Sequence, residues 1–124
     1  MIVEPAQAGE LAAVMNVLDG ADLAIEVGLV EQAIGAEQVL LARSRAGTVL
    51  GALVGRACED STRIEAIAVR PGRRGQGIGT ALIRAAGERW GTLTAEFDPP
   101  LAPFYRQAGF EIEGAKRLRG RRDR

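Results

Sequence analysis

The segment RPGRRGQGIGTALI, residues 70–83, constrains this chain more than any other feature. It joins TRIEAIAV, a run typical of a strand, to a run whose apolar residues recur at helical spacing. Its four glycines give the joint backbone freedom, and a helix start offers unpaired N–H groups with a partial positive charge. Phosphate oxygens bind well at such a start, and nearby arginines can add charge-assisted hydrogen bonds. The segment therefore predicts a diphosphate-binding turn.

The spacing within this segment excludes two common phosphate-binding motifs. The P-loop signature needs a lysine that the segment lacks, and the dinucleotide signature needs a third glycine where Thr80 stands. The alternative to a phosphate site is a glycine-rich turn whose arginines are only solvated.

Apolar periodicity and turn residues predict a succession of short elements along the chain. The expected strands are 1–4, 38–44, 48–57, 62–69, 92–97, 110–113 and 116–119. The expected helices are 7–19, 22–34 with Asp22 as a candidate cap, 77–90, and one that begins at Asp98 as its cap and ends at a left-handed Gly109. Short connections favour one domain over residues 1–119, followed by a basic tail at 120–124.

The composition is that of an ordinary globular domain, with 47% apolar and 26% charged residues in 124. The longest apolar stretch is far shorter than the ~20 residues that span a bilayer, and no signal peptide is evident. The single Cys58 cannot form an internal disulfide. We therefore expect a cytoplasmic protein that does not bind a membrane.

Histidine is absent from the chain. Its absence excludes the usual Ser-His-Asp and Cys-His nucleophile pairs and the HExxH zinc site, so we expect no metal. Any chemistry must use carboxylates, the single Tyr105, arginines, Lys116 or backbone amides.

Charge is unevenly distributed although the net charge is zero. Residues 1–42 hold seven acids and no base, and residues 43–124 hold the other nine acids and all sixteen bases. This asymmetry predicts that a cationic ligand would favour the earlier part of the chain and an anionic one the later part.

Two stretches carry a resemblance to a known family. IAVRPGRRGQGIGTALI resembles the acetyl-CoA motif of the GNAT N-acetyltransferases, whose signature Q/R-x-x-G-x-G/A is met by Arg74, Gly77 and Gly79. FYRQAGF, residues 104–110, is similar to a second motif of that family, and the expected order of elements also agrees. The resemblance implies an α/β (mixed α+β) fold: a single GNAT-like domain with a central mixed sheet of about six to seven strands and about four helices.

The same resemblance implies where acetyl-CoA would bind. Backbone amides of residues 74–80 would hold its pyrophosphate, and the strand before them would hydrogen-bond the pantetheine arm. An amide near Ile67 would stabilise the oxyanion of the reaction. The family often has Asn where this chain has Asp98, which puts a pantetheine contact there in doubt. The implied cofactor-binding residues are Ile67, Val69, Arg74, Gly75, Gln76, Gly77, Ile78, Gly79 and Thr80.

The implied reaction moves an acetyl group from acetyl-CoA directly to a primary amine, with no protein nucleophile. Most amines are protonated at neutral pH, so a proton acceptor is expected. Glu65 is the first candidate and Glu96 the second, and each has the alternative of being a solvated or paired strand carboxylate. Tyr105 occupies the position from which the family gives a proton to the departing thiolate. Its alternative is a core aromatic residue.

Two rival functions come from other classes. One is a GNAT-like module that binds acyl-CoA for regulation or scaffolding without transfer. The other is a nucleic-acid-associated protein, suggested by the basic end KRLRGRRDR but disfavoured because no aromatic residues are interleaved with the charge. The expected partners are acetyl-CoA and an amine acceptor, and a homodimer is compatible with this prediction.

Overall fold

The computed structural model describes residues 1–20 and 25–124. The strands are β1 (Ile2–Pro5), β2 (Val39–Arg43), β3 (Val49–Ala57), β4 (Thr62–Val69), β5 (Leu93–Phe97), β6 (Glu111–Glu113) and β7 (Leu118–Arg122). The α-helices are α1 (Leu11–Gly20), α2 (Val27–Gly35), α3 (Ile78–Trp90) and α4 (Ala102–Gln107). Short 3₁₀ turns η1 (Ala8–Glu10), η2 (Pro71–Arg73) and η3 (Pro99–Leu101) precede α1, α3 and α4.

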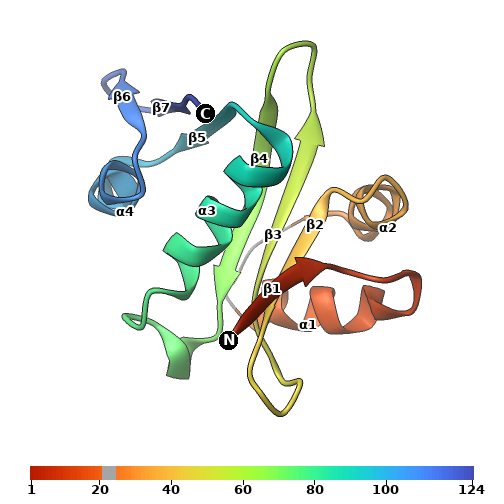
Figure 1. Ribbon diagram of the computed structural model, residues 1–124. Coiled ribbons are helices and arrows are strands. Elements are labelled where there is room, and N and C mark those ends of the chain that lie inside the picture. The colour runs from red at the N-terminus through yellow and green to blue at the C-terminus, as the bar shows by residue number, and fades with distance from the viewer. Residues whose placement is uncertain (21–24) are drawn as a thin grey trace.

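The described strands form one mixed sheet in the order β1-β2-β3-β4-β5-β7-β6 (Figure 1). Every neighbouring pair is antiparallel except β4 and β5, which are parallel and joined by α3. The expected mixed α+β fold, its central sheet and its four helices are confirmed. The last two strands, β6 and β7, pair antiparallel, and β7 lies between β5 and β6.

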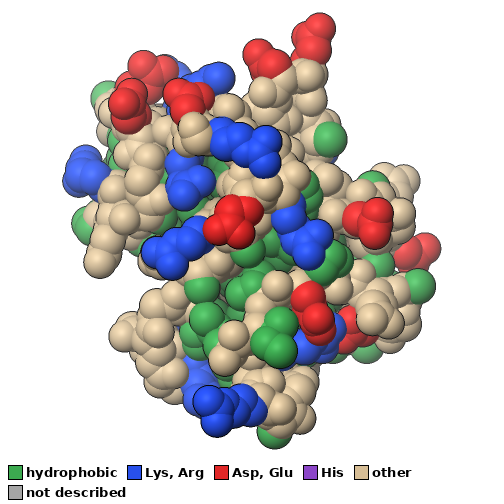
Figure 2. Space-filling model, in the orientation of Figure 1, with side chains coloured by type: hydrophobic (Ala, Val, Ile, Leu, Met, Phe, Trp, Pro, Cys, Tyr) green, Lys and Arg blue, Asp and Glu red, His purple; other side chains and the backbone are tan. Residues whose placement is uncertain are grey.

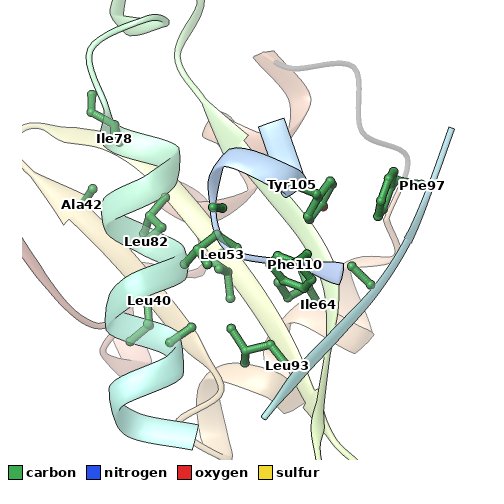
Figure 3. Close-up of a cluster of buried hydrophobic side chains, with 14 of the residues drawn as sticks. Leu40, Ala42, Leu53, Ile64, Ile78, Leu82, Leu93, Phe97, Tyr105 and Phe110 are labelled. Atoms are coloured by element: carbon green, nitrogen blue, oxygen red, sulfur yellow. The ribbon is translucent and has the colours of Figure 1, made fainter. Parts of the chain in front are cut away.

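Helices cover the sheet on both faces and create two hydrophobic cores. Residues of α3 and α4 pack with one set of strand residues, and residues of α1 and α2 pack with the alternate set. In β3, for example, Leu53 faces α3 while Ala52 and Val54 face α1. Period-two alternation of a strand buried on both faces explains why β2 and β3 read as continuous apolar runs. Figure 3 shows the first core, in which Leu40, Leu53 and Leu82 lie between the sheet and α3.

Two ends differ from the boundaries predicted above. The second helix begins at Val27, and the candidate cap Asp22 lies outside the described residues. β7 runs to Arg122, so most of the tail expected at 120–124 is part of the sheet. The half-buried Arg122 donates from Nε to the carbonyl oxygen of Ala108 at 3.0 Å, which ties β7 to the end of α4. One arginine of this arginine-rich end thus has a structural role, beside the pairing of β7 with β5 and β6.

Asp98 occupies the predicted N-cap position, with Pro99 in the first turn, but its side chain does not act as the cap. Asp98 precedes η3 in extended conformation, but its side chain makes no cap hydrogen bond. Its carboxylate accepts a hydrogen bond from Arg117 Nη1 at 2.9 Å instead. A charged partner is a stronger donor than a backbone amide, which explains the choice. Gly109 has φ +101°, as predicted for the end of this helix.

Candidate active site

A bulge interrupts β4 in the middle of the sheet. Ile64 and Ala66 pair with consecutive residues of β3, so Glu65 between them has no partner in the ladder. The extra residue changes which face the later residues meet: Ile64 belongs to the core under α3 and Ala66 to the core under α1. The bulge at Glu65 lies two residues before Ile67, near which the resemblance implies an oxyanion-stabilising amide.

The parallel strands β4 and β5 separate soon after they begin. Their ladder holds only two pairs, Thr62 with Leu93 and Arg63 with Thr94. From the bulge onward β4 pairs with β3 but leaves its other edge unpaired. Ile67 and Val69, the residues predicted to bind a pantetheine arm, lie on this open stretch and are half-buried. We call the space between the separated strands the fork.

The glycine-rich joint follows the open end of β4 and begins α3. Gly77 has φ +82° at the N-terminal cap and provides no side-chain cap, and Gly75 has φ +76°. The first hydrogen bond of the helix runs from the Ala81 amide to the Gly77 carbonyl oxygen at 3.0 Å. The three preceding amides, those of residues 78–80, therefore have no acceptor within the helix. A Cβ at either positive-φ glycine would meet nothing within 4 Å, so the space above the joint is open.

The arginines around the joint have different tasks. Arg70 donates from Nε to the carbonyl oxygen of Val49 at 2.7 Å, which fixes the end of β4 to β3. Arg73 and Arg74 are exposed, as is Gln76. The exposed arginines are therefore the ones that could reach an anion at the helix start.

Gly79 has a packing role that the motif did not predict. It is buried, and a Cβ there would lie 2.8 Å from Cε1 of Phe104. The missing side chain lets the ring on α4 approach the first turn of α3. Two neighbours in the motif are likewise partly or fully enclosed: Ile78 is buried in the core and Thr80 is half-buried, so Ile78 and Gly79 can offer a ligand only their backbone.

Tyr105 lies in the core beside the end of β5. Its ring stacks on Phe97 with centroids 4.1 Å apart, and it meets Phe104 and Phe110 edge to face at 5.1 Å each. Figure 3 shows Tyr105 and Phe97 facing each other. Burial raises the pKa of Tyr105 to about 12, against a smaller lowering by the charge of Arg117. The phenol is therefore protonated at neutral pH, as a proton donor must be.

The two candidate bases lie close to arginines at the fork. Glu65 Oε1 lies 2.9 Å from Arg56 Nε and 3.9 Å from Arg63 Nε. Glu96 Oε2 accepts a hydrogen bond from Arg63 Nη2 at 2.9 Å. The side chain of Glu65 is 17% exposed and that of Glu96 39% exposed. Sequence reasoning named both carboxylates but neither of the arginines that hold them.

A polar hollow of about 510 Å³ extends from Arg63 along the face of the sheet that α4 does not cover. Its lining alternates acids and arginines from four strands. The lining residues are Arg63, Thr94, Ala95, Glu96, Glu111, Ile112, Glu113, Arg119, Gly120 and Arg121. The hollow is large enough for a small molecule or a few residues of a peptide.

The acidic N-terminal part is less distinct in the structure than in the sequence. Arg43 binds Glu4 at 2.8 Å and Glu10 at 2.6 Å, so two of its acids are paired with a base from a later strand. The hydrogen bond from Arg43 is the main cause that lowers the pKa of Glu10. Figure 2 shows acidic and basic side chains interspersed over the face turned to the viewer.

Comparison with known proteins decides the family. A family model described as an acetyltransferase (GNAT) domain matches residues 35–112, well over half of the chain. The chain belongs to the GNAT acetyltransferases. It is therefore an acyltransferase of the N-acetyltransferase class, as the two motifs indicated.

Solved structures show the same fold at low sequence identity. A GNAT acetyltransferase from Bacillus cereus ATCC 10987 has a TM-score of 0.85 and 13% identity over 99% of this chain and 96% of its own. The PaiA N-acetyltransferase from Thermoplasma acidophilum, solved with coenzyme A, has 0.81 and 13% over 99% and 98%. A ribosomal-protein-alanine N-acetyltransferase from Brucella melitensis has 0.75 and 22% over the full length of both chains. No curated protein matches this GNAT chain.

The described residues show neither a metal-binding cluster nor a membrane-spanning helix. Residues 1–20 and 25–124 contain no group of three or more acids, cysteines or histidines placed to hold a metal ion. No helix in that part of the GNAT domain is long and apolar enough to cross a membrane.

Proposed function

We propose that the protein transfers the acetyl group of acetyl-CoA directly to a primary amine. The observation that carries the proposal is the open edge of β4, which leads to the uncapped start of α3. An extended ligand can pair with such an edge as an added strand, and a diphosphate can bind the free amides at the helix start. Family membership and the coenzyme A in a neighbour's structure support this placement.

The residues at the joint divide into backbone and side-chain ligands. Amides from Arg74 to Thr80 hold the pyrophosphate, and the exposed side chains of Arg74 and Gln76 reach it as well. Ile67 and Val69 bind the pantetheine arm through their backbone groups. Gly79 contributes its backbone amide. Because it has no side chain, it also lets the ring of Phe104 pack close to the start of α3.

The reaction needs no covalent enzyme intermediate. An ammonium acceptor loses one proton to a base, and the neutral nitrogen attacks the thioester carbon. The C–N bond forms as the C–S bond breaks, the nitrogen gives up a second proton, and the sulfur receives one. The products are an acetamide, coenzyme A with a free thiol, and one released proton. Glu65 takes the first proton, and Tyr105 gives a proton to sulfur.

Stabilisation by acetyl-CoA tests the proposed diphosphate site at the start of α3. Acetyl-CoA at a hundred times its dissociation constant is expected to stabilise the parent by about 2.7 kcal/mol. Gly77→Val removes this gain because its side chain occupies the space above the free amides. Gly47→Val is the matched control: Gly47 also has positive φ, +88°, and open space around it, but lies in the turn between β2 and β3. If acetyl-CoA stabilised both variants equally, the proposed diphosphate site would be refuted.

Thiol release with a panel of amines, amino acids, peptides and aminoglycosides tests transfer. The parent is expected to release coenzyme A with at least one amine. Binding without release from any of them would favour the non-catalytic acyl-CoA module. Tyr105→Phe should keep the fold and the acetyl-CoA affinity and lose about 10- to 100-fold in kcat, the low end for a general acid. An unchanged kcat with rate-limiting chemistry would make Tyr105 a packing residue.

The remaining predictions concern the acceptor, the cellular location and the binding partners. The acceptor carries an amine and favours additional positive charge, although Arg43 reduces the acidic excess that motivates this. The cytoplasmic location, the homodimer and the disfavoured nucleic-acid partner stay as predicted from the sequence.

A further inference from the structure

Two buried glycines of α3 receive side chains from other elements. Gly79 and Gly87 are eight residues apart, about two helical turns, so they lie on similar faces of the helix. A Cβ at Gly79 would lie 2.8 Å from the ring of Phe104, which belongs to α4. A Cβ at Gly87 would overlap Nη1 of Arg122, the last residue of β7. The two missing side chains thus let α4 and β7 approach α3.

The half-buried Arg122 also binds the end of α4. Its Nε donates a hydrogen bond to the carbonyl oxygen of Ala108 at 3.0 Å. Gly109 leaves room for this contact, since a Cβ there would lie only 3.3 Å from Nε. One guanidinium therefore lies against Gly87 of α3 and holds the end of α4. Arginine suits the position because its donors are spread over a rigid plane, whereas lysine has a single nitrogen.

The helix α4 depends on such contacts for its position. It has six residues, Ala102–Gln107, and a helix of this length is unstable without tertiary packing. Phe104 holds its start to α3, and Arg122 holds its end through Ala108. Tyr105 lies between these two points of attachment. The place of its phenol thus depends on both of them.

We propose that Arg122 is a positioning residue that holds Tyr105 in place for proton donation to the departing thiolate. The inference rests on the proposed function. Arg122 lies against the later part of α3, away from the joint that binds the pyrophosphate in that proposal. It therefore affects proton donation through the position of α4 and leaves the binding of acetyl-CoA nearly unchanged.

The ionisation of Tyr105 reports its position without a rate measurement. The aromatic rings that pack on it, those of Phe97, Phe104 and Phe110, do not titrate. Burial raises the pKa of Tyr105 to about 12, and the charge of Arg117 lowers it. A less firmly held α4 would expose the phenol and lower its pKa, whereas simple loss of a positive charge would raise it. The two effects of removing an arginine thus have opposite signs.

The test compares Arg122→Gln with Arg124→Gln. The exposed Arg124 follows the same strand and donates from Nη2 to the carbonyl oxygen of Glu88 in α3 at 2.7 Å. Among the described residues this is its only hydrogen bond, so it matches Arg122 in charge and in contact with α3 but does not bind α4. Steady-state thiol release is measured with the best acceptor, phenolate absorbance gives the ionisation midpoint of Tyr105, and melting temperatures confirm that each variant is folded.

Arg122→Gln is expected to lower kcat by about 10-fold, within the loss expected for Tyr105→Phe, and to change KM for acetyl-CoA by less than about twofold. The ionisation midpoint of Tyr105 should fall by about one pH unit from that of the parent. Arg124→Gln should match the parent in kcat and in this midpoint. Arg122→Lys keeps the charge with one donor, so it should lie between the parent and Arg122→Gln.

A double variant separates positioning from a general loss of structure. When Tyr105→Phe has already removed the phenol, adding Arg122→Gln should cost no further kcat, because the positioned group is gone. A purely structural role would lower kcat by the same factor in both backgrounds. Gly87→Ala guards against an Arg122→Gln variant that does not fold, because alanine favours the helix but displaces the guanidinium. It should lower kcat and the ionisation midpoint in the same direction as Arg122→Gln.

Three results would overturn the proposal. The first is an Arg122→Gln or a Gly87→Ala enzyme with the parent's kcat. The second is an equal loss from Arg122→Gln with and without the hydroxyl of Tyr105, and the third is an ionisation midpoint of Tyr105 that rises. A parent that binds acetyl-CoA but acetylates no amine would instead refute the proposed function. In that case the role of Arg122 in transfer is refuted with it, while the ionisation midpoint still shows whether Arg122 holds Tyr105.

Discussion

The buried phenol of Tyr105 sets an alkaline limit to stability that one substitution should remove. The residue is 5% exposed, and burial raises its pKa to about 12, with Arg117 acting in the opposite direction. In the unfolded chain the phenol has its ordinary pKa of about 10. Between these values the unfolded state releases a proton that the folded state keeps.

The sign of the effect follows from this difference. A group whose pKa is raised by folding adds full stability below its unfolded pKa, and that stability is lost as pH rises through the folded value. The free energy of unfolding should therefore fall between about pH 10 and pH 12. Two units correspond to about 2.7 kcal/mol in total, and about 1.4 kcal/mol is already lost at about pH 11.

Tyr105→Phe isolates this contribution because the chain has a single tyrosine. The near-ultraviolet absorbance of the phenolate should report a midpoint near 12 in the folded parent and near 10 in denaturant. Denaturant unfolding at about pH 8 and about pH 11 should show an extra loss of about 1.4 kcal/mol in the parent compared with the phenylalanine variant. A folded-state midpoint near 10, or an identical pH dependence of both proteins, would refute the argument from burial.

Three further predictions concern the stability contributed by single residues. Gly79→Ala should cost about 1 to 3 kcal/mol by overpacking against Phe104, and chemical denaturation that shows no loss would contradict the close contact. Gly28→Ala, in α2 with open space around it, should instead stabilise by about 0.5 to 1 kcal/mol, and a destabilised variant would argue against helix at that position. The pKa of Glu10 is lowered by Arg43, so the parent should lose stability as pH falls below about 4.5. In acid, the free energy of unfolding of Glu10→Gln should depend less on pH than that of the parent. Identical pH dependence in the two proteins would refute a contribution from the Arg43–Glu10 pair.

Local chemistry made the start of α3 predictable from the sequence. A strand with strong apolar character, a proline and closely spaced glycines specify a turn into a helix without reference to distant residues. The positive φ of Gly77 and the uncapped helix start agree with that prediction. The free amides and the open space above the joint are the features on which the proposed diphosphate site rests.

Pairings between distant strands explain what the sequence did not predict. The position of the bulge depends on the register of β4 against β3, and β7 enters beside β5 through contacts that no local pattern encodes. Asp98 had the sequence of a cap, but Arg117, from the loop before β7, competes for its carboxylate. The Arg63 and Glu65 pair did leave a signal, since residues two apart on a strand share a face, but that signal is weak next to a bulge.

The open edge of β4 lies in the middle of the sheet, where an unpaired strand is unusual. Edge strands elsewhere are usually short, charged or covered, because free backbone groups bind other chains. Here the stretch after Glu65 is apolar, half-buried or buried, and lies between β3 and the departing β5. The bulge turns its residues to a new face, and Arg63 and Glu96 are hydrogen-bonded beside the last pair of the ladder. The proposed function accounts for both features, because an extended ligand with an anionic group at one end would pair with the open edge and bind at the helix start.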